Sequence, residues 1–148
     1  MLINKENLKL LGDNYETHHR VFDEFMDKIS HLFINIPSLY FEFLPDETRM
    51  KYLGKTYSFR HHYNIEEKTG YLTIYCAAGP DNIEYLEEIE KYQFKTEGNA
   101  RLANSSDPGF PWNMLSFTED FFYQLIDNIV EYTIEKERQG YSRIWRKL

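Results

Sequence analysis

The chain has 148 residues, of which 42% are hydrophobic and 17% aromatic, and its formal net charge at pH 7 is -7. This length and composition predict one folded domain (1–148) and argue against disorder. The acidic balance disfavours a nucleic-acid binder, because affinity for nucleic acid comes mainly from cations that neutralise phosphates. The single cysteine, Cys76, excludes an intramolecular disulfide and a cysteine-based zinc site. No apolar run approaches the roughly 20 residues of a membrane span, and a cytoplasmic protein is expected.

Two helices are expected before the first strand. Asn4 is a good N-cap for a short helix that Gly12 would end. Asp13 and Glu16 then have the spacing of a capping box, which begins a second, long helix that Pro37 ends. Apolar side chains recur at helical spacing along this second helix and form one stripe: Tyr15, His18, Phe22, Phe25, Ile29, Leu32, Phe33 and Ile36.

The apolar period then changes from helical spacing to strict alternation, which predicts strands. Four strands are expected in succession, over residues 39–44, 48–53, 57–65 and 71–77. A short acidic helix is expected from Asp81 to about Glu90. The alternation of Tyr92 and Phe94 predicts a fifth strand, which Gly98 ends.

Residues 98–116 contain two prolines and two glycines with little periodicity, and are expected to form a long loop. Ser116 and Glu119 repeat the capping-box spacing at the start of another long helix, which Gly140 would end before a basic tail (141–148). The predicted fold class is α+β. We expect an antiparallel sheet of about five strands, with two long helices (N- and C-terminal) packed on one face and the short acidic helix inserted.

The doublet His61–His62 lies in the third predicted strand. Neighbouring side chains in a strand point to opposite faces, so the doublet cannot bind one metal ion as a pair. A four-residue turn to the next strand would pair Tyr63 with Leu72 and His61 with Ile74. This register predicts an apolar face that carries Phe59, His61, Tyr63, Leu72, Ile74 and Cys76. The opposite face would carry Arg60, His62, Thr73 and Tyr75.

Two groups of side chains are candidate binding residues. Arg60, His62 and Tyr75 share the outer sheet face, where a cation beside an aromatic ring could hold an anionic or protein ligand. The alternative is an ordinary solvated sheet face, which is often polar and mixed. Phe110 and Trp112 form an aromatic pair in the predicted loop. If exposed they would anchor a protein interface, and if buried they would plug one end of the core.

A pocket between the helices and the sheet is a further candidate site. Tyr15, His18, His61 and Tyr63 would line it. The alternative for His61 is a neutral, buried imidazole that makes one hydrogen bond. Two histidines without a carboxylate are a weak metal signal, so neither a metal site nor a cofactor is predicted. No glycine-rich phosphate loop, HExxH or GxSxG motif occurs, and no catalytic residue is predicted.

We therefore expect a small acidic protein-binding module, such as an inhibitor, immunity-type protein, adaptor or chaperone, that binds one protein partner stoichiometrically. Whether the chain is also an enzyme stays open, and the non-enzymatic interpretation is favoured. The alternative is a small-molecule-binding domain or small enzyme, with a pocket lined by His18 and His61. Neither a membrane nor a nucleic acid is expected as a partner, and a homodimer is left open.

Overall fold

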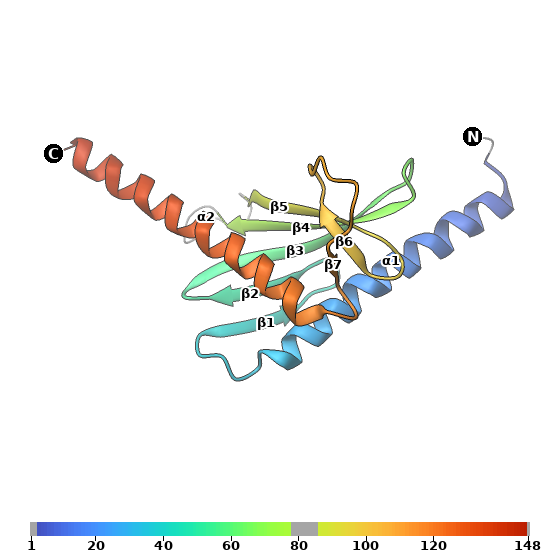
Figure 1. The fold of residues 1–148 in the computed structure, drawn as a ribbon, viewed down its shortest axis with the longest axis horizontal. Helices are drawn as coiled ribbons and strands as arrows, with labels where there is room; N and C mark the ends of the chain where they lie inside the picture. The colour runs from blue at the N-terminus through green and yellow to red at the C-terminus, as the bar shows by residue number, and fades with distance from the viewer. Residues whose placement is uncertain (1–2, 78–85, 148) are drawn as a thin grey trace.

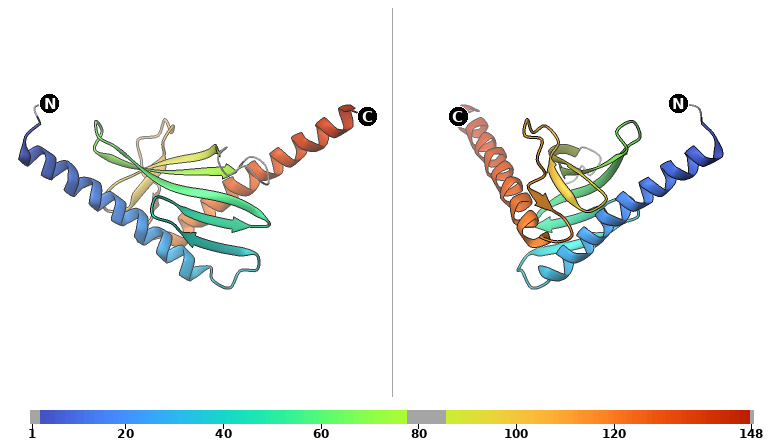
Figure 2. Two further views of the ribbon diagram at one scale, coloured as in Figure 1. Left: turned by 180° about the vertical axis from the view of Figure 1, so that it is seen from behind. Right: turned by 45° about the vertical axis from the view of Figure 1, so that its right-hand side comes forward.

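Two long helices pack against one curved sheet (Figure 1). The computed structural model describes residues 3–77 and 86–147, and their side chains as far as residue 139. Helix α1 spans Lys5–Leu32 and helix α2 spans Thr118–Lys147. The chain between the two helices forms a seven-stranded antiparallel sheet, a half-barrel whose strands follow one another in chain order. The start of α1 and the end of α2 extend beyond the sheet on opposite sides (Figure 2).

The sheet is larger than the sequence predicts. Its strands are β1 (Leu39–Phe43), β2 (Thr48–Tyr52), β3 (Lys55–Asn64), β4 (Thr69–Ala77), β5 (Leu86–Phe94), β6 (Asn99–Leu102) and β7 (Trp112–Asn113). The expectation of about five strands was wrong, because the segment 98–116 that was expected to be a loop contains both β6 and β7. Gly98 makes this return possible: its φ of 93° is readily adopted by glycine, and its N–H donates to the Lys95 carbonyl across the turn.

The prediction of a short acidic helix from Asp81 to about Glu90 was also wrong for residues 86–90. Residues 86–90 belong to β5, and residues 81–85 lie outside the described residues. Glu87 lies opposite Cys76 of β4, and its carboxylate forms an ion pair with Lys136 of α2 at 2.9 Å. Pairing with β4 thus overrides the helical character of this glutamate-rich stretch, since strand preference depends strongly on cross-strand neighbours.

Helix α1 begins where the sequence predicts but is one helix, not two. The Asn4 side chain accepts a hydrogen bond from the Asn7 N–H at 2.8 Å, which confirms it as the N-cap. The helix continues through Gly12 and ends at Leu32, before Pro37 is reached. A single glycine costs only about 1 kcal/mol inside a helix, less than a complete break in its hydrogen bonds. For the same reason α2 continues past Gly140 through most of the predicted basic tail.

Because α1 is continuous through Gly12, a substitution of this glycine by alanine should make the protein more stable. A Cβ atom added there would meet no atom within 4 Å. We expect Gly12→Ala to stabilise α1 by about 0.5–1 kcal/mol, because alanine loses less backbone entropy in a helix than glycine does. Urea unfolding and amide hydrogen exchange of residues 8–12 measure this effect. A destabilised variant would instead indicate the helix end that the sequence suggested.

The hairpin of β3 and β4 keeps the predicted faces although its register differs. His61 lies opposite Leu72 and Tyr63 lies opposite Gly70, so the expected pairing was wrong by two residues. The turn is set by Asn64, whose side chain accepts from the Glu67 N–H at 2.8 Å. A shift of two residues leaves every side chain on its original face, because side chains alternate with a period of two.

Both helices pack on the same face of the sheet, where the core lies. Phe121 of α2 is fully buried, and its ring contacts Phe25 of α1, Tyr92 of β5 and Trp112 of β7 at centroid distances of 5.2–5.8 Å. Burial of aromatic rings of this size is the main driving force that holds the two helices on the sheet. Neither α1 nor α2 packs on the other sheet face, which we call the open face (Figure 1).

Candidate functional site

The open face is defined by the pairing of the strands. One cross-strand row comprises Glu42, Arg49, Ser58, Tyr75 and Glu88. The next comprises Arg60, Thr73 and Lys91, and the third comprises His62, Tyr71, Gln93 and Arg101. The three candidate binding residues of the sheet, Arg60, His62 and Tyr75, therefore lie together on this face.

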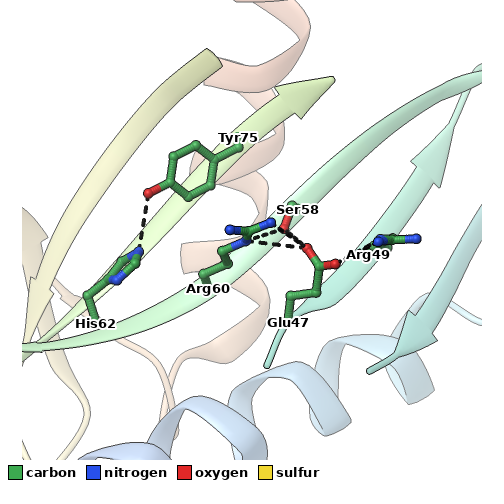
Figure 3. Close-up of polar contacts among 6 residues, drawn as sticks. All are labelled: Glu47, Arg49, Ser58, Arg60, His62 and Tyr75. Atoms are coloured by element: carbon green, nitrogen blue, oxygen red, sulfur yellow. Dashed lines mark hydrogen bonds and ion pairs between the residues drawn. The ribbon is translucent and has the colours of Figure 1, made fainter. Parts of the chain in front are cut away.

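Two arginines on the open face share one carboxylate (Figure 3). Glu47 directly precedes β2, and its side chain is only 11% exposed. Its Oε1 accepts from Arg49 at 2.8 Å and its Oε2 accepts from Arg60 at 3.2 Å. The Ser58 hydroxyl also donates to Oε2. Charged hydrogen bonds from three directions fix the carboxylate and hold both guanidinium groups in place.

The surroundings of Glu47 change its pKa in opposing ways. Burial acts to raise the pKa of this carboxyl, but the hydrogen bonds from Ser58 and Arg49 and the charges of Arg49 and Arg60 act against it. The net result is a pKa below the usual value for glutamate. Glu47 is therefore ionised at neutral pH, and it neutralises one of the two arginine charges beside it.

Tyr75 links Arg60 to His62 (Figure 3). The Arg60 guanidinium lies 5.3 Å from the centre of the Tyr75 ring, and the Tyr75 hydroxyl is 3.2 Å from Nε2 of His62. Burial, followed by the positive charges of Lys91 and Arg60, lowers the pKa of His62 below its ordinary value. His62 is thus neutral at pH 7 and acts here as a hydrogen-bonding group rather than a cation.

A second group of cations lies at the β5–β6 end of the open face. The Lys91 ammonium lies 4.6 Å from the centre of the Tyr71 ring. Lys95 and Arg101 lie 4.3 and 4.7 Å from the centre of the Phe110 ring. None of these three cations forms an ion pair with a carboxylate in the part of the chain that the structure describes. This end of a net acidic protein is therefore locally positive.

The aromatic pair of the predicted loop is divided between the two sides of the sheet. Phe110 contacts Lys95 and Arg101 of the open face. Trp112, in β7, instead stacks on Phe121 and packs edge-on against Tyr92, at 5.8 and 5.9 Å. Of the two roles proposed for this pair, Trp112 takes the position of a core plug, whereas Phe110 lies beside Lys95 and Arg101 on the open face.

The candidate pocket residues do meet between α1 and the sheet. His18 is 3% exposed, packs against Tyr63 and Phe94, and its Nδ1 lies 2.8 Å from the Asn14 carbonyl. Tyr15 stacks on His61 at 5.7 Å. These four aromatic side chains fill the space between helix and strand with ring contacts. The groove described below and a smaller hollow near the start of α1 are both lined by other residues.

His61 is hydrogen-bonded to His19, which sequence reasoning did not select. Their Nδ1 atoms are 3.0 Å apart, and Nε2 of His19 is 3.5 Å from the Asp23 carboxylate. With the His19 proton on Nε2, toward Asp23, Nδ1 of His19 accepts and His61 donates from its own Nδ1. Nε2 of His61, which has no hydrogen-bond partner among the described residues, then carries a lone pair and no hydrogen. Burial and the neighbouring histidines lower the pKa of His61 to about 3.

This histidine cluster lacks the composition of a metal site. Among residues 3–77 and 86–147, no group of three or more histidine, cysteine, aspartate or glutamate side chains could hold a metal ion. The cluster is best described as an aromatic contact between α1 and β3, in which the His61 imidazole is neutral at pH 7. It corresponds to the structural role that was the alternative for His61.

A groove of about 570 Å³ lies beside the Glu47 network. Arg49, Ser58 and Arg60 form part of its wall, and Tyr132 and Lys136 of α2 also line it. The groove therefore borders the polar side chains of the Glu47 network on one side and α2 on the other.

Comparisons with protein families, with curated proteins and with solved structures gave no match for this chain. The function must therefore be inferred from the side chains themselves. In the part of the chain that the structure describes, no helix combines the length and the apolar composition needed to cross a membrane.

Sequence reasoning did not select Glu47, Lys91 or Arg101. Lys91, Gln93 and Lys95 alternate along one face of a strand, and this signal was available in the sequence. We did not use this alternation because residues 81–90 were expected to form a helix and residues 98–116 a loop. The position of Glu47 depends on a turn geometry for which the sequence offers no comparable signal.

Proposed function

We propose that this protein is a non-enzymatic protein-binding module whose open sheet face binds an acidic segment of a protein partner. The observation that carries the proposal is a group of three cations, Lys91, Lys95 and Arg101, that form no ion pair among the described residues. They are gathered with Tyr71 and Phe110 on the sheet face that neither α1 nor α2 covers. Aromatic and arginine side chains are the ones that contribute most to protein interfaces.

Charge complementarity supports an acidic partner. The chain as a whole carries a net charge of -7, so most of its surface repels anions. An acidic segment that approaches the open face meets three cations that form no ion pair with a carboxylate among the described residues. A long polyanion such as a nucleic acid would extend over the acidic remainder of the molecule and be repelled there. A short acidic stretch of polypeptide fits this distribution better.

A cytoplasmic location is part of the same proposal. Cys76 is a free thiol, and no other cysteine is present to pair with it within the chain. Domains without disulfides are typical of reducing compartments. A homodimer remains an alternative to a different partner protein, and the mass of the captured complex distinguishes the two.

The test is affinity capture of partners with two charge-matched variants. We expect Lys91→Glu combined with Arg101→Glu to reduce recovery of a stoichiometric partner at least tenfold, because both positions then repel an acidic segment. Lys5→Glu combined with Lys9→Glu changes the net charge equally on exposed residues of α1 and should leave recovery unchanged. Crosslinking then identifies the bound segment, and circular dichroism shows that both variants are folded.

Three results would contradict the proposal. The first is equal loss of the partner in both charge variants, which would indicate a general effect of net charge. The second is a crosslinked segment that is not acidic. The third is a captured partner whose binding does not weaken as the salt concentration rises from 50 to 300 mM, since exposed charge pairs are screened by salt.

A further inference from the structure

Thr73 of β4 has a buried hydroxyl group without a partner. The residue is 1% exposed, and its Oγ1 makes no hydrogen bond with any residue that the structure describes. Leaving a buried hydroxyl unsatisfied destabilises the folded state, so such groups are rare in folded proteins and need an explanation. Thr73 lies on the open face, in the middle of the sheet, rather than in the core beneath the helices.

Two cations flank this hydroxyl on the neighbouring strands. Arg60 of β3 and Lys91 of β5 are the direct cross-strand neighbours of Thr73. Side chains in these positions have Cβ atoms about 4.5–5.5 Å apart, within easy reach of one small anion. Arg60 uses Nε and Nη2 toward Glu47, which leaves Nη1 as a donor that is not used there. Lys91 has only the Tyr71 ring as a described partner for its ammonium group.

We propose that Thr73, Arg60 and Lys91 form a binding site for one carboxylate group, supplied by an aspartate or glutamate side chain of the acidic partner segment. This inference deepens the proposed function and rests on it. The hydroxyl and the two cations all donate hydrogen bonds, and the two oxygens of a carboxylate accept them. Binding would provide the hydroxyl with the acceptor that it lacks in the free protein.

The two cations beside Thr73 are held in different ways. Lys91 contacts the Tyr71 ring, a weak contact at an exposed position, whereas Arg60 contacts the Tyr75 ring and is also paired with Glu47. An incoming carboxylate draws the Lys91 ammonium away from the Tyr71 ring, which opens a path to the threonine, while Arg60 keeps its ion pair with Glu47. Tyr71 thus holds Lys91 near the site without a counter-ion among the described residues, and Glu47 holds Arg60 on the other side of Thr73.

The experiment uses a blocked tetraglutamate peptide and inorganic phosphate as probes, with backbone NMR shifts of the full chain as the readout. We expect the peptide to shift the amide signals of residues 60, 73 and 91. Thr73→Val should weaken peptide binding about tenfold through loss of one hydrogen bond to a charged group. Thr73→Ser should retain binding, and Thr69→Val provides the same chemical change elsewhere on β4 as a control.

A stability measurement without peptide gives an independent result. Thr73→Val removes an unsatisfied hydroxyl, so its midpoint of urea unfolding should equal or exceed that of the wild type. A lower midpoint would show that the hydroxyl has a structural partner and would overturn the site. Equal peptide affinity of Thr73→Val and wild type, or a response to phosphate alone, would overturn it as well.

The two sets of variants distinguish a wrong carboxylate site from a wrong proposed function. If Thr73→Val binds the peptide normally while the Lys91→Glu and Arg101→Glu variant loses its partner, the carboxylate site is overturned and the binding face stands. A partner that this charge variant still binds overturns the proposed function, and with it the assignment of the carboxylate to a partner protein.

Discussion

Replacing Phe121 by alanine should lower the free energy of unfolding by about 3–5 kcal/mol. This ring is fully buried and joins α2 to α1 and to the sheet through Phe25, Tyr92 and Trp112. Removal of a buried phenylalanine loses the transfer free energy of the ring and leaves a cavity. Domains of this size have total stabilities of about 5–15 kcal/mol, so the variant should lose much of its resistance to urea.

Phe117 provides the matched control, since it precedes Phe121 by one turn and is 66% exposed. Phe117→Ala should change the free energy of unfolding by less than about 0.5 kcal/mol. Urea unfolding followed by circular dichroism measures both variants. Equal effects of the two substitutions would contradict the packing of α2 described here.

Acid should destabilise the protein through His61. The pKa of His61 is lowered to about 3 by burial and by the charges of His19, His18 and His62, whereas an unfolded histidine has a pKa near 6.5. Between these values the unfolded chain binds a proton that the folded protein does not, so stability falls as the pH falls through this range. We expect a loss of about 1–2 kcal/mol between pH 7 and pH 5, allowing for the solvent-exposed part of the ring.

Two substitutions separate this protonation effect from ordinary packing. His61→Leu should cost stability at pH 7, where ring contacts are lost, but should be less sensitive to acid than the wild type. Phe22→Leu alters a ring 6.0 Å from His61 and introduces no titratable group, so its cost should be the same at every pH. Urea midpoints at pH 7, 6 and 5 provide the comparison. Parallel curves for His61→Leu and the wild type would refute the role of this imidazole.

The interpretation of His61 illustrates where sequence reasoning succeeded. Strand geometry separated His61 from His62 correctly, and the two residues lie on opposite faces of β3. The same reasoning assigned Arg60, His62 and Tyr75 to one face even though the predicted pairing was two residues in error. Face assignments are robust because they depend only on alternation along each strand, whereas the register depends on how one turn closes.

The partner of His61 could not be obtained in this way. The helical stripe correctly placed His18 in the interior, but the hydrogen bond to His61 comes from His19, at the edge of that stripe. Which of two adjacent helical residues reaches a strand depends on the angle and height at which the helix crosses the sheet. That crossing is set by the packing of all the core side chains together, and no local pattern encodes it.

The amino-acid sequence by itself determined the N-cap at Asn4, the two long helices, the first four strands and the division of β3 into an apolar and a polar face. Each of these depends on neighbours within a few residues. The alternation of Tyr92 and Phe94 also predicted the end of β5 correctly. The tertiary structure decided the continuity of α1, the first part of β5, the strands β6 and β7 and the separation of Phe110 from Trp112. It also placed Thr73 between Arg60 and Lys91. These features depend on cross-strand pairs and core contacts between distant segments, whose free energies exceed the roughly 1 kcal/mol of local preference at a single residue.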